Sequence, residues 1–217
     1  MPREANAADP TRRRQAAAVA GHRRDPTTVR TFLADPDHGV RATALGALLR
    51  AKDLQEADLQ TGLTDPHPTV RSRVAELVAD LRGGGPATNV ALLPLLSDDD
   101  PTVVEVAAWA CGERDPAERG TVARLAALAT DADDALIRES AVAALGSLGD
   151  EAGLAAILTA TGDKATVRRR AVIALAPFDG PEVEAAFQRA LTDRDWQVRQ
   201  AAEDLANPPD PNLDPPN

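Results

Sequence analysis

A short block of sequence recurs six times along this chain, and this repetition restricts the fold more than any other feature. Each copy contains a leucine or its substitute, a turn rich in Asp and Pro, a Val-Arg pair and an alanine-rich apolar stretch. Successive copies are separated by 30, 33, 34, 30 and 31 residues. A period in this range indicates a solenoid, in which each unit buries its apolar face against its neighbours. The Arg of the pair is, in order, Arg41, Arg71, Arg138, Arg168 and Arg199, with Val104 in its place in the third copy.

Each copy predicts two amphipathic helices. Before the last turn, Val183, Phe187 and Ala190 recur with the spacing of one helix face, and Val40 and Ala44 begin the same pattern after the first turn. We find no useful alternation of period two, so we expect no sheet. The sequence therefore predicts an all-α fold, a right-handed α-solenoid of about six two-helix repeats with an N-terminal capping helix.

The repeats divide the chain into three regions. Arg-rich and Ala-rich sequence around Arg13 predicts a basic capping helix within residues 1–25. Residues 26–206 form one repeat array in this interpretation. Residues 207–217 contain so many prolines that no helix can form, and we expect a disordered tail or a short extended spacer.

Composition indicates a core of small side chains and gives no sign of an oxidising compartment. Hydrophobic residues make up 43% of the chain, but aromatic residues only 2%, so Ala, Val and Leu must fill the core. The one cysteine, Cys111, excludes an intramolecular disulfide and occupies a position where other copies have a core residue. We see no apolar run of membrane-spanning length, and we expect a cytoplasmic protein without a membrane segment.

The charge is distributed unevenly. The net charge is −10, yet residues 1–30 carry seven Arg against three acidic residues. The remaining 17 basic and 31 acidic residues make the body acidic, and an acidic body repels a phosphate backbone. This disfavours nucleic acid as a partner unless the basic end acts alone.

The repeated L-x-D-x-x-x-x-V-R core, followed by A-x-x-x-L, resembles HEAT repeats, and in particular the short bacterial kind of the phycobilisome lyase subunits. The resemblance covers about 180 residues. It implies that turn aspartates and the arginines of the Val-Arg pairs form a ladder between repeats, with the second helices lining a concave surface. The implied acidic members are Asp35, Asp65, Asp98, Asp131 and Asp193, and the basic members are Arg41, Arg71, Arg138, Arg168 and Arg199. Val104 interrupts the ladder, Gly162 replaces its Asp in the fifth repeat, and Asp131 is shifted by one residue.

A partner-binding surface is expected two and five residues after the Arg position of each copy, which is Val104 in the third copy. The middle repeats place there Arg73, Glu76, Val106, Trp109, Arg170 and Ile173. An exposed Trp109 rimmed by arginines has the composition of an interaction hot spot. Alternatively, Trp109 fills space between repeats. We expect Trp196, in the last turn, to cover the last repeat.

Catalytic and metal-binding patterns are sparse. The histidines lack the H-E-x-x-H spacing of a helical metal site. His38 and His67 follow Asp35 and Asp65 in neighbouring repeats and could approach a common cation, although solvated capping residues are the simpler interpretation. We expect no metal and no cofactor.

The function that this pattern favours is a non-catalytic scaffold that binds a protein or peptide partner on its concave surface. The resemblance also implies an alternative, an enzyme subunit of the phycobilin-lyase kind, with Arg73 and Arg170 beside Trp109 facing the propionates of a chromophore. A helical-repeat protein that binds DNA is a third possibility, disfavoured by the acidic body. The sequence does not indicate an oligomeric state, so we take a monomer as the default.

Overall fold

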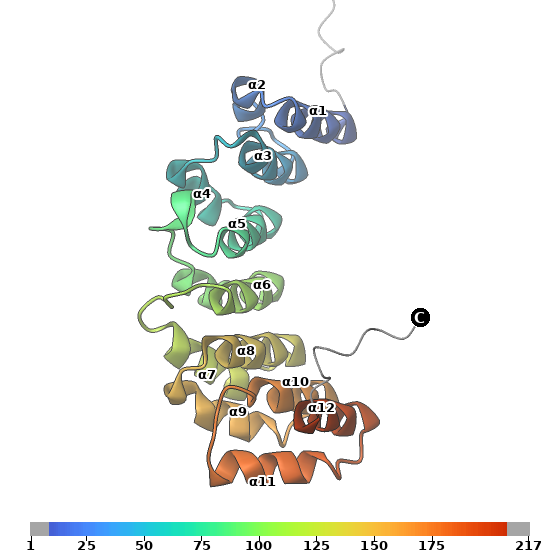
Figure 1. Ribbon diagram of the computed structural model, residues 1–217. Helices are drawn as coiled ribbons and strands as arrows, with labels where there is room; N and C mark the ends of the chain where they lie inside the picture. Colours follow the sequence, from blue (N-terminus) through green and yellow to red (C-terminus); the bar gives the residue numbers. More distant parts are fainter. Residues whose placement is uncertain (1–8, 208–217) are drawn as a thin grey trace, which may run out of the picture. The chain divides into compact units, whose positions relative to one another are not determined.

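The computed structural model describes residues 9–207, and in this part of the chain all regular secondary structure is helical, with no strand (Figure 1). The prediction of an all-α fold is confirmed. The predicted tail at 207–217 lies outside the described residues except for Asn207, as do the first eight residues of the predicted capping region. Among residues 9–207, no helix has both the length and the apolar composition needed to cross a membrane.

The helices belong to two series that alternate along the chain. The second helices of the repeats are α1 (Pro10–His22), α3 (His38–Ala51), α5 (Pro68–Asp80), α6 (Pro101–Gly112), α8 (Ala135–Leu148), α10 (Ala165–Ala174) and α12 (Trp196–Ala206). The first helices are α2 (Pro26–Arg30), α4 (Glu56–Leu63), α7 (Thr121–Asp131), α9 (Leu154–Ala160) and α11 (Pro181–Ala190). The Arg of each Val-Arg pair is the fourth residue of its second helix, and Arg13 occupies the same position in α1.

The chain divides into two compact units, residues 1–110 and residues 111–217. In the first unit, α1 packs on α3 and α3 packs on α5, while α2 contacts both α1 and α3. Aspartates precede α1 and α3, where Asp9 and Asp37 accept hydrogen bonds from the N–H groups of Thr11 and Val40. Such acceptors satisfy amides that have no partner within the helix.

The third repeat departs from the predicted pair of α-helices. Two 3-10 helices, η1 (Gly85–Ala87) and η2 (Leu93–Ser97), replace its first helix. Gly83 and Gly84 precede η1 and Gly85 begins it, and Pro86 and Pro94 each remove a backbone donor, so the segment does not sustain an α-helix. Its apolar residues are nevertheless buried, among them Val90, Leu92 and Leu96.

In the second unit, α7 packs on α8, α8 on α10, and α10 on α12. A short 3-10 helix, η3 (Glu151–Gly153), precedes α9. At the C-terminal end of this unit, Val172 of α10 forms a buried cluster with Val198 and Ala202 of α12 and with Ala190 of α11. Aliphatic and small side chains therefore form this core, as the low aromatic content predicts.

Glycine allows neighbouring second helices to approach closely. A Cβ atom added to Gly146 of α8 would lie 2.6 Å from the Cα atom of Ala174 in α10. A Cβ atom on Gly21 of α1 would lie 2.7 Å from that of Ala47 in α3. Real Cβ atoms do not come so close, so only glycine fits, and the small partner residue is equally necessary.

The eighth residue of each second helix, four residues after the position of the Val-Arg arginine, distinguishes the last helix from the others. In the earlier second helices, this position is apolar and buried, as at Ala17, Leu45, Ala75, Val142 and Val172. In α1, whose main partner is α3, Ala17 faces the following repeat. In α12 the corresponding residue is the exposed Glu203. The charged side chain gives α12 a polar outer face, as expected of a terminal repeat.

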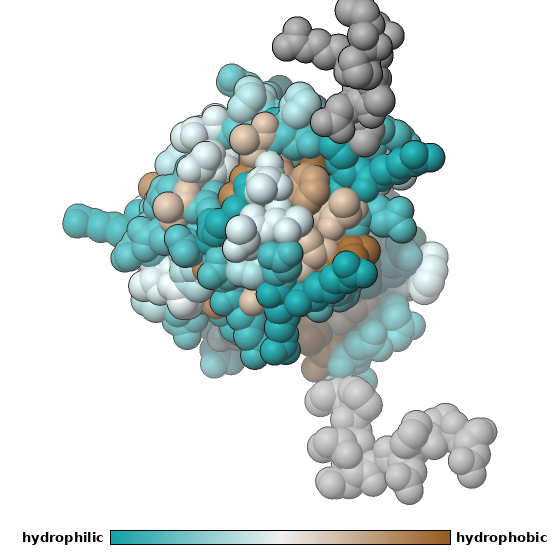
Figure 2. Space-filling model, turned by 90° about the horizontal axis from the view of Figure 1, so that it is seen from above, coloured by the Kyte–Doolittle hydropathy of each residue, from teal (hydrophilic) through white to brown (hydrophobic). Residues whose placement is uncertain are grey.

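The α1 end of the molecule is mixed in character. Val19 of α1 is 39% exposed, and the neighbouring Ala16 is also exposed. The view from above shows hydrophilic residues over most of this end, with a smaller group of hydrophobic residues between them (Figure 2).

Candidate functional site

Charged side chains join the turns of consecutive repeats in the first unit. Each arginine donates two hydrogen bonds, from Nε and Nη2, to the carboxylate of the next turn. The N–O distances are 2.7 and 3.0 Å in the first pair and 2.7 Å throughout the other two. This two-bond geometry is the strongest arrangement available to Arg and a carboxylate. The pairs are Arg13–Asp35, Arg41–Asp65 and Arg71–Asp98.

Two further pairs occur in the second unit. Arg138 binds Asp163 at 2.6 and 2.9 Å, and Arg168 binds Asp193 at 2.9 and 2.7 Å. These five pairs constitute the Arg–Asp ladder. In each of its last four arginines, Nη1 also donates to a backbone carbonyl of its own turn, 2.7 or 2.8 Å away. One guanidinium therefore joins two turns.

The ladder aspartates also organise their own turns. Asp65 accepts the N–H of His67 at 2.9 Å, and Asp98 accepts the N–H of Asp100 at the same distance. Hydrogen bonds from Arg71 are the main cause that lowers the pKa of Asp98, and those from Arg138 and Arg168 act likewise on Asp163 and Asp193. These carboxylates are therefore held in the charged form.

The sequence prediction of the ladder was wrong at one acidic position. Asp131 is exposed, is the last residue of α7, and makes no ion pair among residues 9–207. Ala132 instead occupies the turn, where its carbonyl accepts from Arg138. In the fifth repeat the turn is one residue shorter. The ladder aspartate is therefore Asp163, which binds Arg138, and not residue 162, where the spacing of the other repeats would place it.

The two ends of the ladder also differ from the prediction. Arg13, which the sequence analysis did not include, is the partner of Asp35. Arg199 donates from Nη1 to the carbonyl of Asp193 at 2.7 Å, but it has no carboxylate partner in the described part of the chain. Arg13 could have been identified from the sequence, because it is the fourth residue of a second helix, as is the Arg of each Val-Arg pair.

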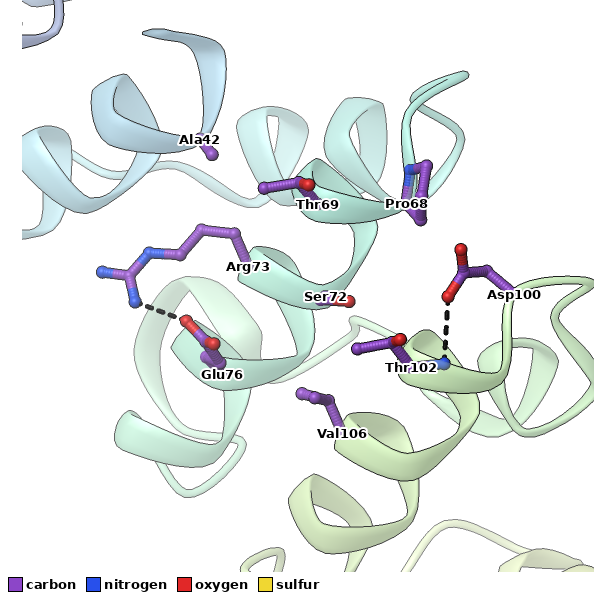
Figure 3. A pocket seen from close by; sticks show the side chains of 9 residues that line it. All are labelled: Ala42, Pro68, Thr69, Ser72, Arg73, Glu76, Asp100, Thr102 and Val106. Carbon is purple, nitrogen blue, oxygen red and sulfur yellow. Dashed lines mark hydrogen bonds and ion pairs between the residues drawn. The ribbon is translucent and has the colours of Figure 1, made fainter. Parts of the chain in front are cut away.

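A hollow of about 410 Å³ lies on the second-helix face of the first unit. It is open to one side and receives residues from three consecutive second helices and their turns (Figure 3). The close-up shows Arg73 and Glu76 on α5, with Thr102 and Val106 on α6. We call this hollow the α5–α6 groove. Its lining residues are Ala42, Pro68, Thr69, Ser72, Arg73, Glu76, Asp100, Thr102 and Val106.

Arg73 is held in place at the edge of this groove. Its Nη1 donates to the Glu76 carboxylate at 2.7 Å, and its Nη2 occupies the space above Gly46 that a Cβ atom would need. A larger residue at position 46 would displace the guanidinium. Gly46 and Glu76 thus orient Arg73, while its remaining donors stay available to a ligand.

The predicted surface residues are divided between the two units. Arg73, Glu76 and Val106 line the α5–α6 groove, but Trp109 does not. Trp109 is 42% exposed, which does not agree with the alternative that it fills space between repeats. In the second unit, Nη2 of Arg170 lies 3.5 Å from Oε1 of Glu139. Ile173 lines a separate hollow between α10 and α12.

Trp196 does not cover the last repeat as expected. It is the first residue of α12, and 64% of it is exposed. A ring at the first position of a helix projects away from the turns that follow, so it can contribute only one edge to the repeat.

His38 and His67 stack on each other, with ring centroids 3.3 Å apart and an interplanar angle of 3°. The nitrogen lone pairs lie in the ring planes, so two stacked rings cannot direct them at one cation. Nδ1 of His67 already accepts the N–H of Thr69. Between residues 9 and 207, no group of three His, Cys, Asp or Glu side chains is placed to hold a metal ion.

Comparison with known proteins identifies the type of repeat. The sequence profile of HEAT repeats matches residues 56–146 and 89–175. No curated protein matches the chain.

Solved structures with a similar fold include both engineered and natural proteins. An engineered protein is 21% identical, with 82% of this chain and 94% of that one covered and a TM-score of 0.61. A designed armadillo repeat protein in complex with the peptide (KR)4 is 19% identical, with coverages of 83% and 97% and a TM-score of 0.61. YibA of Escherichia coli is 17% identical, with coverages of 87% and 72% and a TM-score of 0.62. These similarities show that the fold is an all-α solenoid.

Proposed function

Because this chain belongs to the HEAT-repeat family, we propose that it is a non-catalytic scaffold that binds a protein or peptide partner along the face of its second helices. The observation that carries this proposal is the α5–α6 groove, in which three consecutive second helices contribute side chains to one open hollow. Solenoids offer extended surfaces of this type to their partners.

The chemistry of the groove suits an extended peptide. Thr69, Ser72 and Thr102 supply hydroxyl groups that both donate and accept hydrogen bonds, as a peptide main chain requires. Val106 supplies an apolar contact. Arg73 is oriented before a ligand arrives, which reduces the entropy lost on binding.

The charge of the protein favours a basic partner. The chain has a net charge of −10, so its field attracts positively charged segments and raises their rate of association. Glu76 and Asp100 place carboxylates at the groove itself. A designed armadillo repeat protein of similar fold binds a peptide of Lys and Arg, which supports the same chemistry for this groove.

We assign the protein to the short bacterial kind of HEAT repeat and to the cytoplasm. Steps of 30 to 34 residues support the first assignment. The second rests on the one cysteine, Cys111, which is buried and without a second cysteine to pair with.

A peptide library displayed against the full chain tests the proposal. Selected peptides are measured against the wild type, against Ser72→Trp, which fills the groove, and against Gln60→Trp on the exposed side of α4 as a matched control. We expect basic peptides to be enriched and their affinity to fall by about tenfold or more with Ser72→Trp alone. Peptides that bind all three proteins equally would count against the groove.

A further inference from the structure

Two positions on the second helices contribute to the packing between repeats, and the third residue of each helix is one of them. It is Val or Ile, and at most 8% exposed, in every second helix after α1. These residues are Val40, Val70, Val103, Ile137, Val167 and Val198. In α1 the third residue is Arg12, which is exposed. A charge therefore replaces an apolar side chain at this position in α1.

The other position is the eighth residue, which changes at the opposite end of the series. It is apolar and buried in the second helices from α1 to α10, as at Ala17 and Val172. In α12 it is the exposed Glu203. Neither Arg12 nor Glu203 makes an ion pair among residues 9–207. The two terminal helices thus carry unpaired charges of opposite sign at interface positions.

The third and eighth positions meet at an interface between repeats. Val172, the eighth residue of α10, forms a buried cluster with Val198 and Ala202, the third and seventh residues of α12. Packing α12 of one copy on α1 of another copy in the same register places Glu203 against Arg12. The charges of the two terminal helices are therefore complementary in position as well as in sign.

The surface of α1 around Arg12 is available for such a contact. Ala16 and Val19 lie beside it and are both exposed, Val19 to 39%. Their counterparts in α3 are Ala44 and Ala47, which are completely buried. In the space-filling view of this end, hydrophobic residues lie between hydrophilic ones (Figure 2). We call the surface formed by Arg12, Ala16 and Val19 the α1 face.

We propose that the α1 face binds α12 of a second copy of the chain, head to tail, with Glu203 of one copy against Arg12 of the other. An apolar helix is a poorer occupant, because it would bury Arg12 without a counter-charge. An unrelated acidic helix could pair with Arg12, but it would leave Glu203 unpaired. The head-to-tail contact pairs both charges at once.

The other end of the contact differs from the interior interfaces. In the α1–α3 interface the twelfth residue, Gly21, lies against the tenth residue of the next helix, Ala47. The proposed contact has Asn207 and Val19 at these two positions, and their larger side chains hold the helices farther apart. The greater separation leaves room for the long side chains of the ion pair. We expect a modest affinity, because partly exposed ion pairs contribute little.

Every copy carries both surfaces, so the association is heterologous and continues beyond two copies unless a ring closes. The consequence for binding rests on the proposed function: an assembly presents several α5–α6 grooves to one partner and strengthens its binding through avidity. The head-to-tail contact itself does not depend on that groove.

Sedimentation equilibrium of the full chain over a range of concentrations tests the proposal. The average mass of the wild type should rise above that of one chain as the concentration increases. Arg12→Glu and Glu203→Arg each place like charges in the contact, and each should weaken the association by about tenfold or more. A wild type that stays monomeric up to millimolar concentration would overturn the proposal, and so would single variants that associate like the wild type.

Combining the two variants makes the test specific for a head-to-tail contact. In an equimolar mixture, Glu203 of the Arg12→Glu protein can meet Arg12 of the Glu203→Arg protein, so the mixture should associate although neither protein does alone. The double variant Arg12→Glu, Glu203→Arg restores opposite charges and should associate about as strongly as the wild type. If the mixture and the double variant both remain monomeric, the proposal is wrong even if the single variants lose association.

The controls separate this contact from misfolding and from the groove. Both substitutions suit their helices, since an acidic residue is favourable in the first turn and a basic residue in the last, so circular dichroism should show unchanged helix content. Arg50→Glu on α3 and Asp80→Arg on α5 reverse exposed charges elsewhere and should leave the association unchanged. Ser72→Trp should also leave it unchanged, so failure of the groove and failure of this contact can be distinguished.

Discussion

Arg71 donates two hydrogen bonds of 2.7 Å to the carboxylate of Asp98, which lies in the turn of the next repeat. The same guanidinium donates to the carbonyl of Asp65 in its own turn at 2.8 Å. Only 16% of the Arg71 side chain and 8% of the Asp98 side chain is exposed. One side chain therefore holds two turns at a fixed separation, in an environment where water replaces it poorly.

Replacing Arg71 should destabilise the protein. Arg71→Ala leaves the Asp98 carboxylate and the Asp65 carbonyl without their donor, and we expect the free energy of unfolding to fall by about 1 to 3 kcal/mol. Arg50→Ala, at an exposed arginine of α3, should change it by less than about 0.5 kcal/mol. Urea denaturation followed by circular dichroism measures both. Equal effects would show that Arg71 stabilises by charge alone.

Asp163 and Asp131 should differ in their contributions. Asp163→Asn removes the charge that binds Arg138 and should lower the free energy of unfolding by about 1 to 2 kcal/mol. Asp131→Asn, at the exposed end of α7, should have little effect. Thermal unfolding of the two variants distinguishes them. A larger loss of stability with Asp131→Asn than with Asp163→Asn would support Asp131 as the ladder member, as the sequence indicated.

Acid should weaken the Arg–Asp ladder. Arginine hydrogen bonds lower the pKa of Asp98, Asp163 and Asp193 in the folded state below the value of about 3.9 in the unfolded chain. Their stabilisation is therefore complete above the unfolded pKa and is lost as the pH falls through the folded pKa. The free energy of unfolding should thus fall more steeply below about pH 4 in the wild type than in Asp98→Asn. Parallel pH curves for the two proteins would contradict this.

Gly146 should not tolerate a side chain. Gly146→Ala places a Cβ atom where Ala174 already lies, and we expect a loss of about 1 to 3 kcal/mol. At Gly162 the nearest atom to an added Cβ is 3.5 Å away, so Gly162→Ala is a matched control with an expected change near zero. Differential scanning calorimetry of the two variants makes the comparison.

The thiol of Cys111 should be unreactive in the folded protein. Burial raises its pKa to about 12, so almost no thiolate exists at neutral pH. A thiol reagent should modify the protein slowly in buffer and rapidly in denaturing urea, which a colorimetric assay measures. Rapid labelling in buffer would show that this part of the core opens readily.

The repeats could be predicted from the sequence because their signal is local and recurs. Each Val-Arg pair marks the start of a second helix, and the all-α fold follows from the spacing of Ala, Val and Leu. The third repeat was harder, since apolar residues such as Leu92 and Leu96 are buried there without a first α-helix. Hydrophobic content indicates burial, but the glycines and prolines decide the backbone.

The groove could be predicted only in part. Counting from Arg71 located Arg73 and Glu76, and counting from Val104, which takes the place of the Arg in the third copy, located Val106, because positions along a helix have fixed directions. The same count included Trp109, which lies outside the groove, since the count does not specify where the neighbouring turns close it. Asp163 was missed because one deleted residue in a turn moves a side chain without altering the helices on either side.

Glu203 has a practical consequence for anyone who wishes to lengthen this protein. A repeat appended after α12 would have to enclose the Glu203 carboxylate at a position that is apolar in the earlier helices. An additional repeat inserted between α8 and α10, where Val142 and Arg138 provide the apolar and charged contacts, would meet compatible surfaces on both sides. Growth of this array by duplication is therefore easier from within than from its C-terminal end.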